Sequence, residues 1–230
     1  MNETDKRLEV LNKVLLAFDQ SVFEGIVLTG SLSFGQYYSI KKTSDIDLLF
    51  IIKKKNLRKL SKQDFFKNAE FFCDDKLKLM RNFDALFWCD QFINNVKINM
   101  GFCTLNYFKE FCNLRARKWI GSKENKIIRK KILKTINNKT VNSNYLIKKY
   151  KKLYLLTFDL YIKCELVSNP LFSNLFFAKI LYDKGEIKNN LIKLKENLIK
   201  KYGKNTLNLF DYVMPKLSLS IKEKIIEQFS

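Results

Sequence analysis

The residues best suited to chemistry in this chain are two aspartates two positions apart, Asp45 and Asp47. Their segment has a strand-like pattern, so both carboxylates are expected to project from one face, roughly 6 to 7 Å apart at the backbone. Side chains at that separation can converge on two divalent ions, which stabilise the attacking and the leaving oxygen of an in-line displacement. Oxygen ligands suit magnesium. The pair is therefore a candidate site for two Mg²⁺ ions.

A second pair, Gly30 and Ser31, has the residue types of an anion-binding turn. It ends one expected strand and opens a short expected helix, so backbone N–H groups and the helix dipole point at whatever lies there. A residue without a side chain lets a phosphate approach the backbone closely. We therefore expect an anion seat at this turn.

Strands and helices around these pairs can be read from the spacing of apolar residues. Helical spacing over residues 4–20 predicts an amphipathic opening helix. Short apolar runs at 25–29 and 45–52 predict two buried strands, with a short helix expected at 32–38 between them. The two candidate pairs are therefore expected at the ends of strands.

Further along the chain, a capping-box-like start at Ser61 predicts a helix to about Leu79. Two β-prone runs at 83–93 and 96–104 are separated by Asn94-Asn95, which tolerates the backbone of a tight hairpin. Helical periodicity then takes over. It predicts helices at 106–117, 123–136, 143–166, 171–184, 188–202 and 220–229.

These elements predict an α/β (α+β) fold in two domains. A mixed sheet with flanking helices is expected at 1–105, followed by an all-helical domain at 106–230.

The motif Gly30-Ser31, a variable stretch, and then Ser44-Asp45-Ile46-Asp47-Leu48 resembles the signature of the polymerase-beta-like nucleotidyltransferase superfamily. Within it the chain looks most similar to small bacterial enzymes that modify aminoglycosides and lincosamides and carry a helical C-terminal domain. The resemblance implies that Gly30 and Ser31 hold the β- and γ-phosphates of ATP or another nucleoside triphosphate. It also implies that Asp45 and Asp47 ligate Mg²⁺, and that a nucleoside monophosphate passes to an acceptor hydroxyl with release of pyrophosphate.

One position departs from the pattern of the superfamily, which usually supplies a third carboxylate from a later strand. The equivalent run here is Lys97-Ile98-Asn99-Met100, so Asn99 takes the catalytic position where an acid is expected. An amide cannot take a proton, which makes activity uncertain. Asp84 or Asp90, on the preceding expected strand, is an alternative third carboxylate, although each also fits a strand-end residue facing water.

Two further residues, Tyr37 and Lys149, are candidate nucleotide-binding positions. Lys149 lies on the expected helix at 143–166, where a cation would stabilise charge on the leaving pyrophosphate. The acceptor is not determined by these residues. A small molecule such as an antibiotic, a protein and an RNA all remain open.

Composition narrows the chemistry. The chain has no histidine, which excludes His-ligated zinc and Ser-His or Cys-His nucleophiles. Five cysteines without a C-x-x-C pair suggest free thiols in a reducing compartment. We expect a cytoplasmic protein, since neither a signal peptide nor an apolar run of membrane-spanning length is apparent.

The formal net charge of +20 favours an anionic partner, and RNA is one candidate. AT-rich codons would give the same scattered lysines whatever the function. The alternative to an enzyme is a catalytically silent nucleotidyltransferase fold that binds RNA or a protein partner, for example as a toxin-antitoxin component. Asn99 favours that alternative and the Asp45/Asp47 pair opposes it; pairing of two chains into a homodimer is left open.

Overall fold

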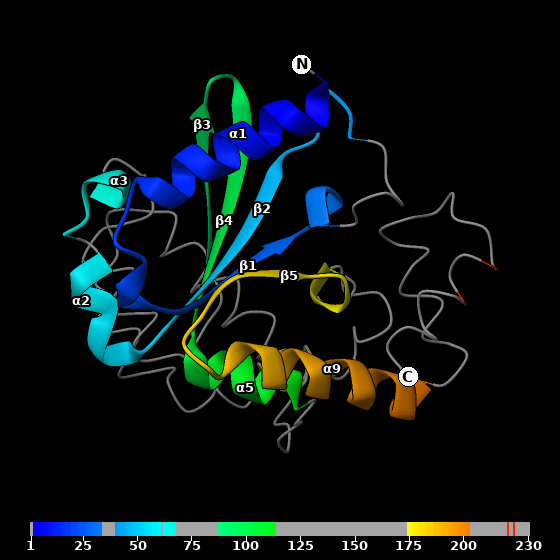
Figure 1. Cartoon of the computed structure of the whole chain (residues 1–230). Helices are drawn as coiled ribbons and strands as arrows, with labels where there is room; N and C mark the ends of the chain where they lie inside the picture. The colour runs from blue at the N-terminus through cyan, green and yellow to red at the C-terminus, as the bar shows by residue number, and fades with distance from the viewer. Residues whose placement is uncertain are drawn as a thin grey trace, which may run out of the picture.

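The structure is a computed structural model that describes residues 2–33, 40–60, 62–67, 87–113 and 174–202, together with Ser220 and Glu223. Its described residues form one mixed five-stranded sheet with helices on both faces, an α+β architecture (Figure 1).

The sheet has the strand order β3-β4-β2-β1-β5. The strands are β1 (Phe23–Thr29), β2 (Ile46–Ile52), β3 (Phe87–Ile93), β4 (Val96–Thr104) and β5 (Lys179–Asp183). The pairs β1/β2, β1/β5 and β3/β4 are antiparallel, whereas β2 and β4 run parallel. The central strand is therefore β2, the one that begins between Asp45 and Asp47.

Three longer helices cover the sheet. They are α1 (Glu3–Leu16) on one face, and α5 (Leu105–Cys112) and α9 (Ile187–Tyr202), which lie together on the other (Figure 1). The short elements are η1 (Gln20–Val22), η3 (Lys54–Asn56), α2 (Leu57–Leu60) and α3 (Asp64–Lys67). Because both faces are covered, the central strands must be apolar nearly throughout, and every residue of β1 and all of β2 except Asp47 is buried.

The core beneath α1 is rich in phenylalanine. Phe50 of β2 stacks on Phe102 of β4 with ring centroids 4.9 Å apart, and Phe18, two residues after α1, meets Phe23 edge-on at 5.5 Å. Offset and edge-on aromatic pairs of this kind stabilise a core beyond their buried area. These aromatic pairs fill the core on the face of β2 opposite Asp47.

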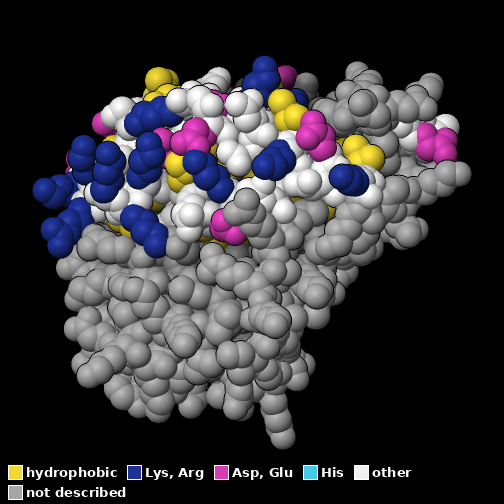
Figure 2. All heavy atoms as spheres, turned by 90° about the horizontal axis from the view of Figure 1, so that it is seen from below, with side chains coloured by type: hydrophobic (Ala, Val, Ile, Leu, Met, Phe, Trp, Pro, Cys, Tyr) yellow, Lys and Arg dark blue, Asp and Glu magenta, His cyan; other side chains and the backbone are white. Residues whose placement is uncertain are grey.

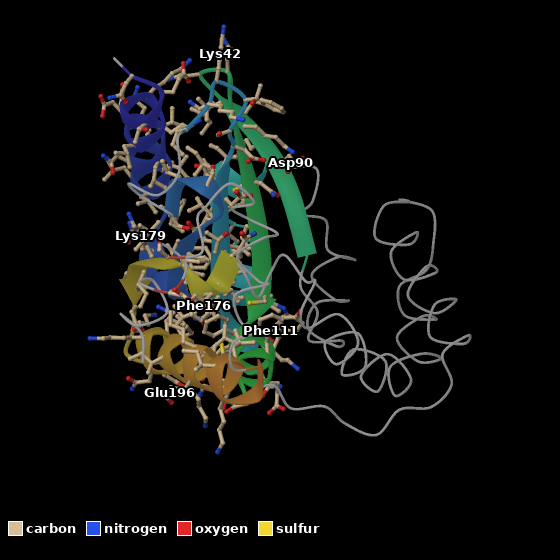
Figure 3. The ribbon with its side chains drawn as sticks, turned by 90° about the vertical axis from the view of Figure 1, so that its right-hand side faces the viewer. Lys42, Asp90, Phe111, Phe176, Lys179 and Glu196 are labelled. Atoms are coloured by element: carbon tan, nitrogen blue, oxygen red, sulfur yellow. The ribbon has the colours of Figure 1, made fainter. Side chains whose placement is uncertain are left out.

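The opposite face of the sheet is packed against α5 and α9. Phe111 of α5 and Phe176 lie between the sheet and α9, while Glu196 points away from it (Figure 3). The approach of α9 is close, since a Cβ built on Gly25 of β1 would lie 2.2 Å from Cγ1 of Ile187. Glycine at this position therefore lets the first turn of α9 rest on the strand.

The expected strands at 25–29 and 45–52 are confirmed as β1 and β2, and the expected hairpin as β3 and β4. At the hairpin turn, Asn94 and Asn95 have φ values of 50° and 60°, which is the left-handed backbone that such a two-residue turn requires. The expected opening helix is confirmed as α1.

The expectation of a helix at 171–184, and with it of an all-helical chain after residue 105, is wrong for part of this region. Residues 179–183 form β5, which pairs with β1 along the sheet edge. A short apolar run fits a helix or a strand by periodicity alone. The strand forms because the edge of β1, which would otherwise be unpaired, has buried backbone groups that need hydrogen-bond partners. The helices expected at 123–136 and 143–166 lie outside the described residues.

Two further observations concern expectations from composition. Cys103 and Cys112 are buried thiols outside any disulfide, as expected for these two of the five cysteines. Among the helices that the structure describes, none is both long and apolar enough to cross a membrane.

Candidate active site

The candidate site lies where β1 ends and where β2 and β4 are near their beginnings. Asp47 of β2 is flanked by Thr29 of β1 on one side and by Asn99 of β4 on the other. Neighbours in register on adjacent strands project from the same face of a sheet. Asp47 and Asn99 therefore project together, on the face opposite the one that Phe50 and Phe102 present to α1.

Gly30 follows β1 directly and touches the Asp47 carboxylate. Its φ of +68° lies in the left-handed region that favours glycine. A Cβ at this position would lie 1.9 Å from Oδ2 of Asp47, so any side chain here would force the Asp47 carboxylate to move. Conformation and space thus both require glycine, and they bring the expected anion seat and the expected metal ligand together.

The turn after Gly30 is closed by Ser33. Its backbone N–H and its hydroxyl both donate to the carbonyl of Gly30, at 3.1 and 2.7 Å. Ser31 is partly exposed at the start of this turn. The helix expected at 32–38 thus begins with a helical turn in its described residues. Residues 34–39, which include Tyr37, lie outside the described part of the chain. So does Lys149.

Asn99, which the resemblance equates with a third acidic residue, lies next to Asp47 on the adjacent strand. Its Nδ2 donates a hydrogen bond of 3.0 Å to Oδ1 of Asp47. An amide in this position orients the carboxylate and favours its charged form, but it adds no negative charge for a cation. Within the described ranges there is no cluster of three or more His, Cys, Asp or Glu side chains arranged to hold a metal ion.

Asp90, one alternative for the third carboxylate, lies opposite Asn99 in the β3/β4 register. Its side chain is about half exposed and forms an ion pair of 2.9 Å with Lys97. The hydrogen bond that Lys97 donates to Asp90 raises the pKa of Lys97, and the nearby carboxylates add to this. Lys42 and Asp90 are both found toward the hairpin end of the sheet (Figure 3). Asp84 lies outside the described residues.

The electrostatics of the site centre on Asp47. Its burial, together with the charge of Asp45, raises the pKa of Asp47 to about 6, although the hydrogen bond from Asn99 and the charge of Lys97 act in the opposite direction. Asp45 is therefore close enough to act on Asp47 electrostatically. A partly buried carboxylate with a raised pKa is a feature of functional sites, because burial of charge costs stability.

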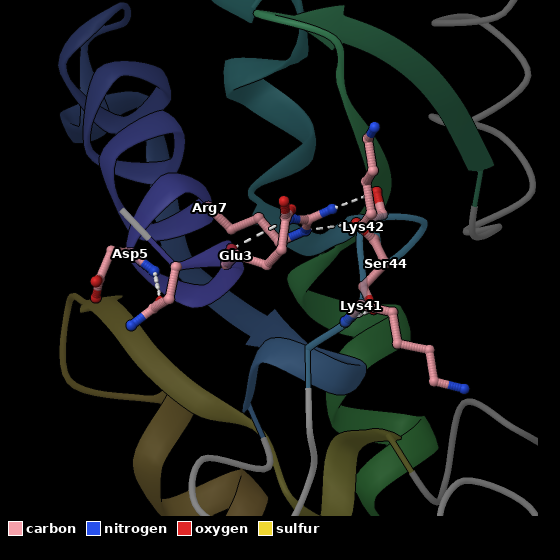
Figure 4. Close-up of polar contacts among 7 residues, drawn as sticks. Glu3, Asp5, Arg7, Lys41, Lys42 and Ser44 are labelled. Carbon is pink, nitrogen blue, oxygen red and sulfur yellow. Dashed lines mark hydrogen bonds and ion pairs between the residues drawn. The ribbon is translucent and has the colours of Figure 1, made fainter.

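A residue that sequence reasoning missed holds the loop before the site. Arg7 of α1 is 2% exposed, and its Nε and Nη2 donate to the carbonyls of Ser44 and Lys42 at 2.6 and 2.7 Å (Figure 4). Its Nη1 donates to the carbonyl of Glu3 at 3.0 Å and also meets the Glu3 carboxylate. This hydrogen bond holds the pKa of Glu3 below its usual value.

Arg7 thus joins the first turn of α1 to the residues immediately before Asp45. The loop closes on itself as well, since Ser44 donates its N–H to Lys41 at 3.0 Å and accepts from the Lys41 N–H at 3.0 Å. A signal was available in the sequence: Arg7 precedes Val10, Leu11 and Val14 by three, four and seven positions, so it falls on the buried stripe of α1.

The sequence-predicted residues that the structure brings together are Gly30, Asp45, Asp47 and Asn99. This constellation comprises two carboxylates, an amide that donates a hydrogen bond to one of them, and a glycine backbone beside it. Comparison of the chain with protein-family models and with curated protein sequences found no match.

Proposed function

We propose that this chain is a magnesium-dependent nucleotidyltransferase, which moves a nucleoside monophosphate from a nucleoside triphosphate to an acceptor hydroxyl and releases pyrophosphate. The observation that carries the proposal is the contact of Gly30 with Asp47. A left-handed glycine with no space for a side chain stands against a partly buried carboxylate. The uncovered backbone at the glycine lets a phosphate approach closely, and the carboxylate beside it can bind a cation at the same time.

The donor set fits Mg²⁺. Asp45 and Asp47 supply carboxylate oxygens, the ligands that this hard cation prefers, and the raised pKa of Asp47 marks negative charge that a cation would compensate. Mg²⁺ held there would neutralise the triphosphate and stabilise charge on the leaving pyrophosphate. The proposal follows the resemblance in taking two ions, and the nucleotide would complete their coordination.

The residues of the chain would divide the remaining work. The backbone at Gly30 and Ser31 would hold the β- and γ-phosphates, and Asn99 would keep the Asp47 carboxylate turned toward the cation through its hydrogen bond. The amide of Asn99 cannot accept the proton of the acceptor hydroxyl. We therefore assign no general base to this chain, and the proton would leave to the substrate or to water.

A second candidate is a catalytically silent protein of the same fold. The presence of Asn99 beside Asp47 favours it, because the residue in that position cannot act as a base. The same site would then bind nucleotide without transferring it.

Transfer is tested by incubating the protein and Mg²⁺ with each of the four α-labelled triphosphates and three acceptor pools, namely aminoglycoside and lincosamide antibiotics, RNA, and the protein itself. We expect label from one triphosphate to enter one pool with an equal amount of pyrophosphate, and both to be lost in Asp45→Asn/Asp47→Asn. Pyrophosphate released equally by that variant would contradict the proposal. Binding of a triphosphate without transfer to any pool would favour the silent candidate.

A further inference from the structure

The end of β2 that is remote from Asp47 leads into a strongly basic segment. Residues 53–62 contain six Lys or Arg and neither Asp nor Glu. These residues, named the basic end below, are Lys53, Lys54, Lys55, Arg58, Lys59 and Lys62. Six residue steps along β2 place this segment about 20 Å from Asp47. It is therefore too far away to serve the phosphates of a nucleotide bound at Gly30.

Local packing turns the basic end outward. Leu57 and Leu60 of α2 are fully buried and anchor the segment in the core, which leaves the intervening positions to solvent. Lys55, Arg58 and Lys59 are exposed accordingly. Figure 2, which views the molecule from below, shows Lys and Arg side chains gathered at the end of the described surface that carries η3 and α2.

A cavity of about 220 Å³ adjoins the basic end. The described residues that line it are Lys53, Lys54, Thr104, Leu105, Asn106 and Lys109. None of these carries a carboxylate, and three carry an ammonium group. Glu24 offsets part of the charge through its 3.1 Å contact with Lys53, and Glu186 pairs with Lys109. The six Lys and Arg residues of the basic end outnumber these two carboxylates.

The residues around the basic end indicate which class of partner it binds. An amphipathic helix that inserts into a membrane surface exposes large apolar side chains beside its cations. The exposed large apolar residues of the described part of the chain lie elsewhere, and the leucines of this segment are buried. Closely spaced cations without apolar neighbours instead match the regularly spaced phosphates of a nucleic acid strand.

We propose that the basic end binds the phosphodiester backbone of a nucleic acid, through Lys55, Arg58, Lys59 and the lysines around the adjoining cavity. This proposal does not rest on the proposed transferase activity, since it concerns another end of the sheet. It holds whether the site at Asp47 is catalytic or silent.

The test measures binding of a fluorescently labelled single-stranded RNA by anisotropy over a series of KCl concentrations. The wild type is compared with Lys55→Gln/Arg58→Gln/Lys59→Gln. A matched control, Lys13→Gln/Lys193→Gln/Lys200→Gln, removes the same charge from exposed lysines of α1 and α9. We expect the first variant to bind at least about tenfold more weakly, with the slope of log Kd against log[KCl] reduced by about 2, because each lost phosphate contact contributes about 0.7.

Two results would overturn the proposal. One is equal weakening in both variants, which would assign binding to net charge alone. The other is absence of RNA binding by the wild type at low salt, including the case in which it binds phosphatidylserine vesicles instead. A measurement on the unaltered chain guards against misfolding of the variant: photocrosslinking to RNA that contains 4-thiouridine should label peptides from residues 53–62, and labelling confined to other peptides would also contradict the proposal.

Discussion

The Asp47 carboxylate is partly buried, so its negative charge costs folding free energy when no cation is bound beside it. Because folding raises its pKa from 3.8 to about 6, the folded state binds this proton more tightly than the unfolded state between those pH values. The contribution of Asp47 to stability therefore falls as the pH rises from about 4 to about 6. Above that range, the ionised carboxylate destabilises the fold.

Removal of this charge should stabilise the protein. We expect Asp47→Asn to raise the free energy of unfolding at pH 7 by on the order of 2 kcal/mol, since its side-chain oxygen can still accept the hydrogen bond from Asn99. The gain should shrink toward pH 4, where the wild-type carboxyl is protonated. Urea denaturation at both pH values measures this, with the half-exposed Asp90→Asn as a control that should change little. Equal or lower stability of Asp47→Asn at pH 7 would contradict the account.

A negative charge added at position 99 should change the stability of the same site. In Asn99→Asp a third carboxylate would stand beside Asp47, so the metal-free protein should lose stability at neutral pH through like-charge repulsion. Millimolar Mg²⁺ should then raise the Tm of this variant by several degrees more than that of the wild type. Asn95→Asp at the hairpin turn adds the same charge away from the site and serves as the control. A Tm increase equal in both variants would mean that no cation site was completed.

Among the elements, α1 acts on the site through Arg7 and the loop before β2. The Arg7 guanidinium donates hydrogen bonds to two loop carbonyls and to Glu3. Its planar set of N–H groups can reach all of these acceptors at once, whereas a single lysine ammonium cannot. The position of Asp45 at the end of this loop is thus fixed by a helix distant in sequence.

The substitution Arg7→Lys keeps the positive charge but removes the planar set of guanidinium N–H donors. We expect faster amide hydrogen exchange at Ser44, whose N–H donates to Lys41, and about tenfold weaker binding of Mg²⁺ and nucleotide, with a loss of about 1 to 3 kcal/mol in global stability. Lys13→Met, which removes an exposed ion pair with Glu9 on the same helix, should change neither exchange nor binding. Unchanged exchange at Ser44 in Arg7→Lys would show that Arg7 does not hold the loop.

Some elements could be predicted from the sequence and others could not, for physical reasons. The strands β1 and β2 were predictable because burial on both faces demands continuous apolar runs, and the hairpin because Asn94 and Asn95 tolerate a left-handed backbone. The strand β5 was not, because its identity depends on the open edge of β1 far away in sequence. Arg7 was missed because its partners are backbone carbonyls of a distant loop.

In the whole molecule, the central strand connects two regions of different charge. Its beginning carries Asp45 and Asp47, and its end leads into the basic end, about 20 Å away. The sequence predicted that Gly30, Asp47 and Asn99 would share a site. The run of six Lys or Arg at 53–62 is visible in the sequence, whereas its proximity to Lys109 of α5 at the adjoining cavity is not.

The proposed function depends on binding of a nucleoside triphosphate through Mg²⁺ at Asp45 and Asp47. Calorimetric titration of ATP, GTP, CTP and UTP, with and without Mg²⁺, tests it on the wild type and on Asp45→Asn/Asp47→Asn. We expect one triphosphate to bind the wild type only with Mg²⁺ and not to bind the variant. Binding that is independent of Mg²⁺, equal in the variant, or absent for all four nucleotides at millimolar concentration would contradict it.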